Sequence, residues 1–587
     1  MHRSRLMPGR LRIQFLALAV ISAVVVAAVP AAAASPLKAG FKTKQASMLT
    51  AVGAGITATP LITVGESVGG YTFEAIPDGI ALKTRGNGRV DVYVNHETSR
   101  VPFPYAPSAP TELTSQNDFD NAQVSLLRLN RKTGGILSGK MVIQSEDNYQ
   151  RFCSSYLGTA KEGFDREILF TNEESVDWVN RTGNAWPAVI GADQARQSGV
   201  VVAYDIRTGQ DRPIWGMGRH NHENSVPLPG FGKIVMLSGD DTFTNNPSQS
   251  QLYSYIAPNA DAVWNDEGRL WAFKSNDGAR QRYEDFPLND SNPISGQFIE
   301  VPSLIATGRN PDGTDLMAAD VPPALGGPYP PPPNTSAWQR DPNGVGIDGP
   351  QWVLEKWSQL NGVFRFIRVE DIAYDKRPGM SNVAYIVDSG RGTAPAAPLP
   401  AFGNGISTNG RVWKMVLDPA DPTKVTAMSI LIEGDDAGVK AVNEIHQPDN
   451  IESTVKGLYF TEDPGSSQQF PFGSTDARAT TARIWQYPFA TGVPTVALKV
   501  NQGADEGPTD VDGTAGVFAP GQLGAWESSG IVDASAAFGP GAFLVDVQAS
   551  TLWVEKAPGD DNVAPAGADF TDKRAGGQLL LVRIPNG

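Results

Sequence analysis

Short runs of apolar and β-branched residues, separated by turn-forming residues, recur along most of the chain. Each run is rich in Val, Ile, Leu, Phe or Tyr and is bounded by Gly, Asn, Asp or Pro, which is typical of β-strands. The runs that predict strands are Val90–Val94, Val124–Leu129, Val200–Tyr204, Ile234–Leu237, Leu270–Phe273, Val383–Val387, Val412–Leu417, Leu458–Phe460, Ile484–Tyr487, Phe543–Val547 and Leu579–Ile584. Convincing amphipathic helices are absent from the pattern, so we expect an all-β protein.

Composition agrees with many strands joined by turns. The 587 residues include 61 Gly and 45 Pro, and 41% of the residues are hydrophobic, enough for a large core. The 63 acidic residues exceed the 48 Lys and Arg, giving a net charge of −15. An acidic chain lacks the basic surface of a nucleic-acid-binding protein, so we expect no nucleic-acid partner. A single cysteine, Cys153, excludes an intramolecular disulfide.

The first 34 residues have the layout of a secretory signal peptide. Four arginines precede an apolar run from Ile13 to Val29, and an Ala-rich stretch ends at Ala34. A single membrane anchor is the alternative, but the run is shorter than the roughly 20 residues that a span needs. We therefore predict a signal peptide over 1–34 and one β-domain over 35–587. The mature protein is expected to be secreted or periplasmic, with no membrane span, and to be a monomer.

Several predicted strands run directly into carboxylates. This ending occurs at Asn95-His96-Glu97, Asn172-Glu173-Glu174, Gly239-Asp240-Asp241, Val387-Asp388 and Thr461-Glu462-Asp463. In a radially repeated β-fold, equivalent strand ends converge on a central axis. Carboxylates that lie so close together must be protonated or bound to a metal ion. We therefore predict a single β-propeller with long loop insertions, such as Gly326–Pro333 and Thr393–Pro400, and a central metal site; two β-domains are the alternative.

The candidate chemistry is that of carboxylates, one thiol and four histidines. Dense Asp, Glu and Asn favour a hard cation, calcium above all outside the cell. Cys153 is either a buried small residue or a ligand that favours a transition metal such as iron. The histidines either belong to the site or only hydrogen-bond strand ends; they are His96, His220, His222 and His446. Because no nucleophile elbow, Walker loop or dinucleotide fingerprint occurs, metal-assisted hydrolysis is the leading enzyme class.

A set of short motifs occurs in a characteristic order along the chain. These motifs are Asn95-His96-Glu97, Arg151-Phe152-Cys153-Ser154, Asn172-Glu173-Glu174-Ser175, His222-Glu223-Asn224, Gly239-Asp240-Asp241, Arg368-Val369-Glu370-Asp371 and Pro448-Asp449-Asn450. In this order they resemble the PhoX-type alkaline phosphatases over nearly the whole mature chain. The resemblance implies a six-bladed β-propeller, a central iron–calcium cluster that includes a cysteine thiolate, and hydrolysis of phosphomonoesters outside the cytoplasm.

The resemblance also implies roles for individual residues. The residues that match its cluster ligands are Cys153, Glu173, Glu223 and Glu370, and further cation ligands or their neighbours would be Glu97, Glu174, Asp240, Asp371 and Asp449. The segment Asn172-Glu173-Glu174-Ser175 departs from the Cys-Glu-Glu-Asn form of the family, which leaves the choice between Glu173 and Glu174 open. Arg368 resembles the guanidinium that binds phosphate, and on a strand it would share a face with Glu370. A purely structural Arg–Glu pair is the alternative.

These observations lead to one expected function and two alternatives. We expect a metal-dependent phosphomonoesterase that uses Ca²⁺ and Fe³⁺ and acts on a small phosphate ester. One alternative is a calcium-dependent propeller enzyme acting on lactones, phosphodiesters or phosphotriesters. The other is a noncatalytic binding protein that calcium stabilises.

Overall fold

The described part of the chain contains all of the predicted strands. The computed structural model describes residues 37–74, 76–97, 120–144, 147, 149–175, 178–180, 195–242, 248–288, 290–332, 348–390, 409–434, 443–463, 470–471, 475, 480–502, 522–555 and 573–585. The chain separates into two units, residues 1–37 and 38–587, and every helix and strand lies in the second. The predicted signal peptide and the loop Thr393–Pro400 lie outside the described residues. Within those residues, no helix is both long and apolar enough to span a membrane.

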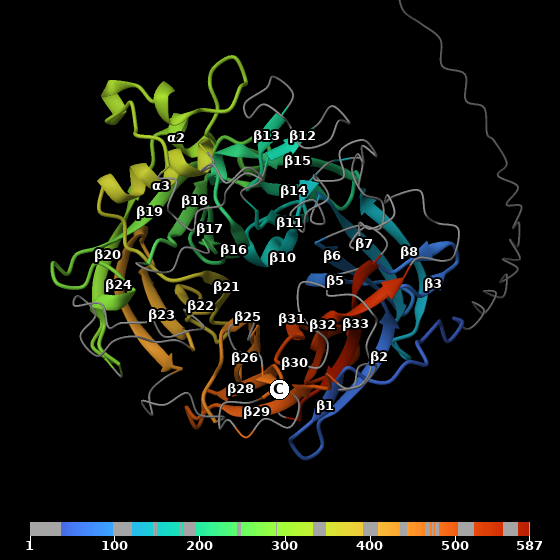
Figure 1. The fold of residues 1–587 in the computed structure, drawn as a ribbon. Helices are drawn as coiled ribbons and strands as arrows, with labels where there is room; N and C mark the ends of the chain where they lie inside the picture. Colours follow the sequence, from blue (N-terminus) through green and yellow to red (C-terminus); the bar gives the residue numbers. More distant parts are fainter. Residues whose placement is uncertain are drawn as a thin grey trace, which may run out of the picture. The chain divides into compact units, whose positions relative to one another are not determined.

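Antiparallel sheets dominate the structure, and each predicted run overlaps one of their strands (Figure 1). Four of the sheets have four or five strands each. The first contains β5 (Pro77–Arg85), β6 (Arg89–His96), β7 (Asp120–Asn130), β8 (Ile136–Ile143) and the short β9 (Tyr149–Gln150). The second contains β10 (Phe152–Gly158), β11 (Ile168–Glu173), β14 (Val201–Asp205) and β15 (Gln210–Ile214). The third contains β25 (Pro448–Ser453), β26 (Gly457–Glu462), β28 (Arg483–Pro488), β29 (Thr495–Val500) and β1 (Leu49–Ala51). The fourth contains β31 (Glu527–Asp533), β32 (Ala542–Glu555), β33 (Lys573–Arg583) and β2 (Thr57–Thr63).

A nine-stranded sheet completes the arrangement. Its strands, in spatial order, are β16 (His222–Leu228), β17 (Ile234–Asp240), β18 (Leu252–Ala257), β19 (Arg269–Ser275), β20 (Ile294–Glu300), β24 (Asp421–Glu433), β23 (Arg411–Asp418), β22 (Val383–Asp388) and β21 (Val369–Tyr374). The two edge strands, β16 and β21, lie against each other, so the sheet is a nearly closed barrel. The fold is therefore mainly β, with a four-bladed propeller-like ring and this barrel-shaped sheet. That confirms the all-β, propeller-like prediction, whereas the large sheet was not predicted.

Smaller elements decorate the sheets. The two-stranded sheets are β3 (Ser67–Val68) with β4 (Tyr71–Thr72), β12 (Trp178–Asn180) with β13 (Ala195–Gln197), and β27 (Phe470–Pro471) with β30 (Gln522–Leu523). The helices are α1 (Ala260–Trp264), α2 (Ser303–Thr307), α3 (Pro350–Leu360) and α4 (Ser535–Phe538), and the 3-10 turns are η4 (Ala160–Glu162), η5 (Trp215–Met217), η6 (Tyr283–Asp285), η7 (Ala318–Asp320) and η8 (Pro323–Leu325). The sequence pattern did not reveal α3, which begins with proline at its first turn and buries Trp352 and Leu354.

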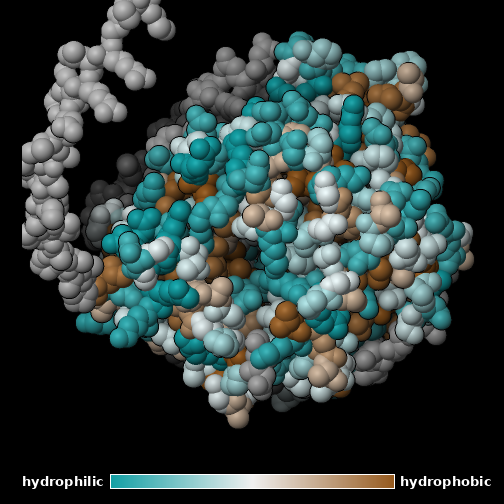
Figure 2. Space-filling model, turned by 180° about the vertical axis from the view of Figure 1, so that it is seen from behind, coloured by the Kyte–Doolittle hydropathy of each residue, from teal (hydrophilic) through white to brown (hydrophobic). Residues whose placement is uncertain are grey.

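Apolar side chains fill the spaces between neighbouring sheets. Val92 of β6 and Leu579 of β33 belong to one buried cluster, which joins the first sheet to the fourth. Val387 of β22 and Leu458 of β26 belong to another, which joins the nine-stranded sheet to the third. Strands covered on both faces bury every residue along their length, as the β11 and β22 strands do. Hydrophilic residues cover most of the outer face seen in Figure 2, and apolar residues appear there only in small groups.

Six strands form the inner ring of the fold. They are β5, β10, β16, β21, β25 and β31, and each contacts the next around the ring, with β31 returning to β5. Four of these strands are the inner edges of the small sheets, and the other two are the edges of the nine-stranded sheet. The ring therefore brings six segments, from Pro77 to Asp533, around one axis.

Candidate metal centre

All six inner strands carry a β-bulge near their first residues. In each inner strand two residues lie opposite a single residue of the neighbouring strand, so the register shifts by one residue. The shifts lie between Pro77 and Ile80, Phe152 and Ser155, His222 and Ser225, Val369 and Ile372, Pro448 and Ile451, and Ser528 and Ile531. A bulge bends its strand and redirects a side chain. Repetition of the bulge in every inner strand therefore aims six side chains at the same region.

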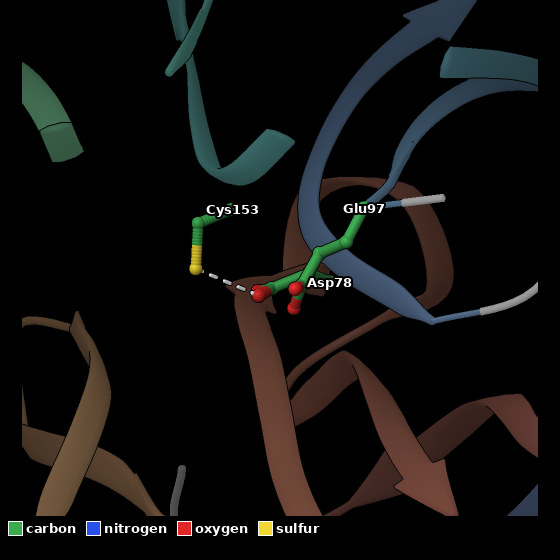
Figure 3. A group of neighbouring side chains, drawn as sticks. All are labelled: Asp78, Glu97 and Cys153. Carbon is green, nitrogen blue, oxygen red and sulfur yellow. Dashed lines mark hydrogen bonds between the residues drawn. The ribbon is translucent and has the colours of Figure 1, made fainter. Parts of the chain in front are cut away.

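The first residue of the bulge is a potential metal ligand in five of the six strands. These residues are Asp78, Cys153, Glu223, Glu370 and Asp449, and Ser529 takes the sixth position. The second strand of two sheets adds Glu97, which follows β6, and Glu174, which follows β11. Together they form three overlapping buried groups, Asp78–Glu97–Cys153, Cys153–Glu174–Glu223 and Glu223–Glu370–Asp449, in each of which the ligand atoms lie within 4.8 Å of one another. We call these seven residues the acidic ring; Figure 3 shows how the side chains of its first group point toward one another.

The strand-end pair Glu173-Glu174 is divided between two environments. The Glu173 carboxylate accepts hydrogen bonds from both terminal nitrogens of Arg196, at 2.8 and 2.5 Å, inside its own sheet. Successive side chains of a strand point to opposite faces. Glu174 therefore lies on the other side, in the acidic ring. Of the two candidates that the sequence left open, the structure brings only Glu174 together with Cys153.

The same division separates Glu462 from Asp463 at the end of β26. Glu462 accepts hydrogen bonds from Nε and one terminal nitrogen of Arg483, at 2.9 and 2.8 Å, and from the indole of Trp485 at 2.8 Å. Asp463 instead interacts electrostatically with acids of the ring, Asp78 and Glu370 among them. At each of these two strand ends, the first acid binds an arginine, and the second acid faces the ring axis.

Two predicted ligands, Asp240 and Asp371, lie outside the three groups of the acidic ring. Asp240 accepts a hydrogen bond from the Thr242 hydroxyl at 3.0 Å and one from the backbone N–H of Gln251, just before β18, at 3.3 Å. Asp371, the second residue of its bulge, accepts hydrogen bonds from the Asn224 amide at 2.6 Å and from the backbone N–H of Ile451 at 2.9 Å. In the structure, Asp371 thus ties three inner strands together.

Two arginines stand immediately before inner strands and contact the acids. Arg368 donates Nε and a terminal nitrogen to Asp241, at 2.9 and 2.8 Å, and its terminal nitrogen lies 3.4 Å from Glu370. Arg151 lies 3.5 Å from Glu97 and 3.8 Å from Glu174. Both arginines have left-handed backbone, with φ of 50° and 33°, which turns the chain sharply into the bulge. Their side chains are 18% and 22% exposed, so both arginines are partly accessible to solvent.

The acidic ring is electrostatically strained in the absence of cations. Burial raises the pKa of each of its carboxyl groups, and repulsion between neighbouring carboxylates adds to the effect. For Glu97, burial raises the pKa to about 8, although Arg151 opposes the shift. The Asp449 carboxyl group also faces Glu527 of β31, whose pKa is raised in the same way. A bound cation would remove this repulsion and keep the groups ionised.

Cys153 lies where the first two groups of the ring meet. Its thiol donates toward Asp78 at 2.9 Å and lies 3.2 Å from Glu223, and it forms no disulfide. Burial, followed by the charges of Asp78 and Glu223, raises the pKa of the thiol well above its usual value. The alternative of an inert thiol in an apolar core does not describe these surroundings, because the sulfur lies within hydrogen-bonding distance of two carboxylates.

The donor set of the ring fits the cations that the sequence suggested. Six carboxylates and one thiol are brought together, and none of the described histidines joins the three groups. Carboxylate oxygens suit Ca²⁺, and the thiolate adds a soft ligand that suits iron better than calcium. The histidines are engaged elsewhere: His96 bonds Ser125 at 2.6 Å, His222 bonds Ser238 at 2.8 Å, and His220 stacks on Tyr253 at 4.7 Å. Buried groups that could hold a metal ion are thus present; which metal they hold stays a prediction.

Sequence reasoning missed two acids near the axis, Asp78 and Glu527, and of the pair Asp240-Asp241 it chose Asp240 as a ligand, whereas Asp241 binds Arg368. Asp78 stands in Pro77-Asp78-Gly79, which reads as a surface turn. The signal that could have found it is the recurrence of one acid or cysteine followed by a small or amide residue, as in Cys153-Ser154 and Asp449-Asn450. Comparisons of the chain with protein-family models and with curated proteins found no match. The likeness to PhoX-type phosphatases therefore stays a prediction.

Proposed function

We propose that this protein is an exported, metal-dependent phosphomonoesterase whose active site is the acidic ring with Arg368 beside it. The observation that carries the proposal is the convergence of six buried carboxylates and one thiol, next to the partly exposed side chain of Arg368. We also infer that the nine-stranded sheet corresponds to two blades joined through β20 and β24, which would make the fold a six-bladed propeller. The export follows from the predicted signal peptide.

The residues that would hold cations are those of the acidic ring. Cations bound there would polarise a phosphoryl oxygen and favour ionisation of a water molecule for hydrolysis. Asp78, Glu223 and Asp449 come from bulges of different strands, so the spacing of these ligands is set by the rigid ring and not by a loop. Such preorganisation keeps charge-stabilising groups in place without reorganisation during the reaction.

Arg368 is the group best placed to bind the phosphate. A planar guanidinium offers two parallel N–H donors to phosphate oxygens. Its contact with Asp241 fixes the side chain, and its contact with Glu370 holds it next to the third group of the ring. Arg151, on the side of Glu97 and Glu174, is a second donor that sequence reasoning did not single out. An ester held by one or both guanidinium groups would face the cations.

The test is hydrolysis of p-nitrophenyl phosphate by the mature protein loaded with Ca²⁺ and iron. We expect activity that Glu370→Gln abolishes and that Arg368→Met lowers by about 10²-fold in kcat/KM, as the loss of one preorganised donor does elsewhere. Arg89→Met, at an exposed arginine of β6, is the matched control and should leave the activity unchanged. Elemental analysis of wild type and Cys153→Ala tests whether iron depends on the thiol.

Two outcomes would count against the proposal. Hydrolysis by the loaded wild type no faster than by Glu370→Gln would exclude a phosphomonoesterase. Faster turnover of a phosphodiester, a phosphotriester or a lactone than of the monoester, in the same panel, would move the protein to another hydrolase class.

A further inference from the structure

A cavity of about 300 Å³ lies on the ring axis beyond the acidic ring. Five of the inner strands contribute to it with residues that follow their bulges, such as Ile80 of β5, Ser155 of β10 and Ile531 of β31. Each of these strands thus first passes the acidic ring and then the cavity. The volume is at the lower end of the range for small-molecule sites, about 300–1,000 Å³.

A layer of hydrogen-bonded side chains separates the cavity from the acidic ring. Asn224 and Asp371, the second residues of their bulges, line the cavity and bond each other at 2.6 Å. The preceding residues, Glu223 and Glu370, belong to the acidic ring. The cavity is therefore a compartment of its own, and the function proposed above does not use it.

The carboxylates around the cavity already accept hydrogen bonds from the protein. Glu162 accepts from the hydroxyls of Tyr374 at 2.8 Å and Tyr156 at 3.3 Å, and from the backbone and side chain of Thr159. Glu452 accepts from Lys376 at 2.7 Å and from two backbone amides. Asp533 accepts from the backbone N–H of residue 535, and Asp371 accepts from Asn224 and Ile451. Few acceptor atoms are left for a cationic ligand.

Two groups at the cavity keep free hydrogen-bonding capacity, the Lys161 ammonium, which donates, and the Ser155 hydroxyl, which can donate or accept. Lys161, on η4, has no ion-pair partner among the described residues; its ammonium lies 5.2 Å from the centre of the Tyr374 ring. Burial and the charge of Lys376 lower the pKa of Lys161, whereas the charges of Glu162, Glu452 and Asp533 oppose this shift. The Ser155 hydroxyl is buried and has no hydrogen-bond partner among the described residues. An anion between these donors would satisfy both the charge and the hydroxyl.

Apolar side chains form much of the remaining wall. They come from all five strands and include Ile80, Leu82, Ile372, Ile451 and Ile531. An inorganic anion would leave these walls without a partner, whereas an organic acid would cover them. We propose that the cavity binds a small organic monoanion, whose carboxylate contacts Lys161 and whose apolar body packs against the isoleucines.

The experiment compares four probes by isothermal titration calorimetry on the mature protein in calcium. Benzoate, benzamide and benzamidinium have nearly the same shape but carry charges of −1, 0 and +1, and inorganic phosphate is an anion without an apolar body. We expect benzoate to bind about ten-fold or more tightly than the other three, in line with a charge-assisted hydrogen bond. Lys161→Met should weaken benzoate about ten-fold, Ser155→Ala should weaken it less, and Lys161→Arg should restore it. Lys140→Met, at an exposed lysine of β8, is the matched control and should change nothing.

Each other outcome would overturn the inference. If benzoate does not bind, or if benzamide or benzamidinium binds equally well, the negative charge of the ligand does not determine binding to the cavity. Binding of benzoate that persists in Lys161→Met would place the ligand elsewhere, including at the acidic ring. Phosphate binding that Lys161→Met abolishes, without benzoate binding, would show a site for inorganic anions instead. None of these results depends on phosphatase activity, so the proposed function can fail while this site stands.

Discussion

Replacing Glu97 with glutamine should have opposite effects on the metal-free and the calcium-loaded protein. Burial among like charges raises the pKa of Glu97 from 4.5 to about 8. Since each pKa unit corresponds to about 1.4 kcal/mol, ionising Glu97 costs the metal-free fold at most about 5 kcal/mol. Because the folded-state pKa is the higher one, this cost is absent below pH 4.5, grows as the pH rises, and is complete above about pH 8. Because glutamine cannot ionise, this free-energy cost should be absent in Glu97→Gln.

The assay is urea unfolding of wild type and Glu97→Gln, with EDTA or with calcium, at about pH 5 and pH 9. In EDTA the variant should match the wild type at the lower pH and have the higher unfolding midpoint at the upper pH. In calcium the order should reverse, because the wild type has one more ligand and gains more free energy from binding. An acid outside the ring supplies the control. Burial raises the pKa of Glu355 on α3 to about 7, so Glu355→Gln should stabilise the metal-free protein at high pH without changing its response to calcium.

The reasoning would be refuted if Glu97→Gln lowered the midpoint in EDTA by the same amount at both pH values. That result would mean that Glu97 acts through its hydrogen bond with Gln548, 3.0 Å away, and not through its charge. A calcium response equal to that of the wild type would separately exclude Glu97 as a ligand.

Three further perturbations test other parts of the site. Arg196→Met leaves a buried carboxylate without its partner and should cost about 3–5 kcal/mol in urea unfolding while metal content stays unchanged; Glu174→Gln should lower metal content instead. Adding calcium and iron to the metal-free protein at pH 8 should release protons, because burial raises the pKa of the Cys153 thiol well above its usual value and that of Glu97 to about 8; a weakly buffered titration that detects no release would contradict this. Gly79→Ala would place a methyl group 2.4 Å from the backbone of β10 and should reduce both stability and metal binding, whereas Gly86→Ala, in open space, should do neither.

The strands and their acidic ends could be predicted from the sequence, because both depend on local patterns. Alternation of apolar and turn residues marks strands such as β6 and β11. The carboxylates that follow them, Glu97 and Glu174, do reach the axis. Which of two adjacent acids turns inward depends on the register with the inner strand, and that is set by a bulge. Glu173 pairs with Phe152 just before the bulge, so its side chain points away from the ring axis.

Other features depend on contacts between distant segments and left no local signal. In the sequence, Asp78 has the appearance of a turn residue. It belongs to the acidic ring because it lies at the bulge of β5, next to β10. The joining of β20 to β24 brings together segments more than a hundred residues apart, and no pattern in either strand indicates the partner. The helix α3 was not predicted because most of its surface is buried, so its sequence lacks a clear polar face.

The pairing of β2 with β33 has a consequence for biogenesis. β2 lies near the start of the folded unit and β33 at its end, and together they complete the fourth sheet, from which β31 reaches the inner ring. A chain that folds from its amino-terminal side therefore contains all seven residues of the acidic ring before β33 can complete the fourth sheet. Until β33 has been added, the fourth sheet is incomplete, and water has freer access to the carboxylates. High-affinity metal capture should thus be a late event, and a chain lacking β33 should be both unstable and metal-poor.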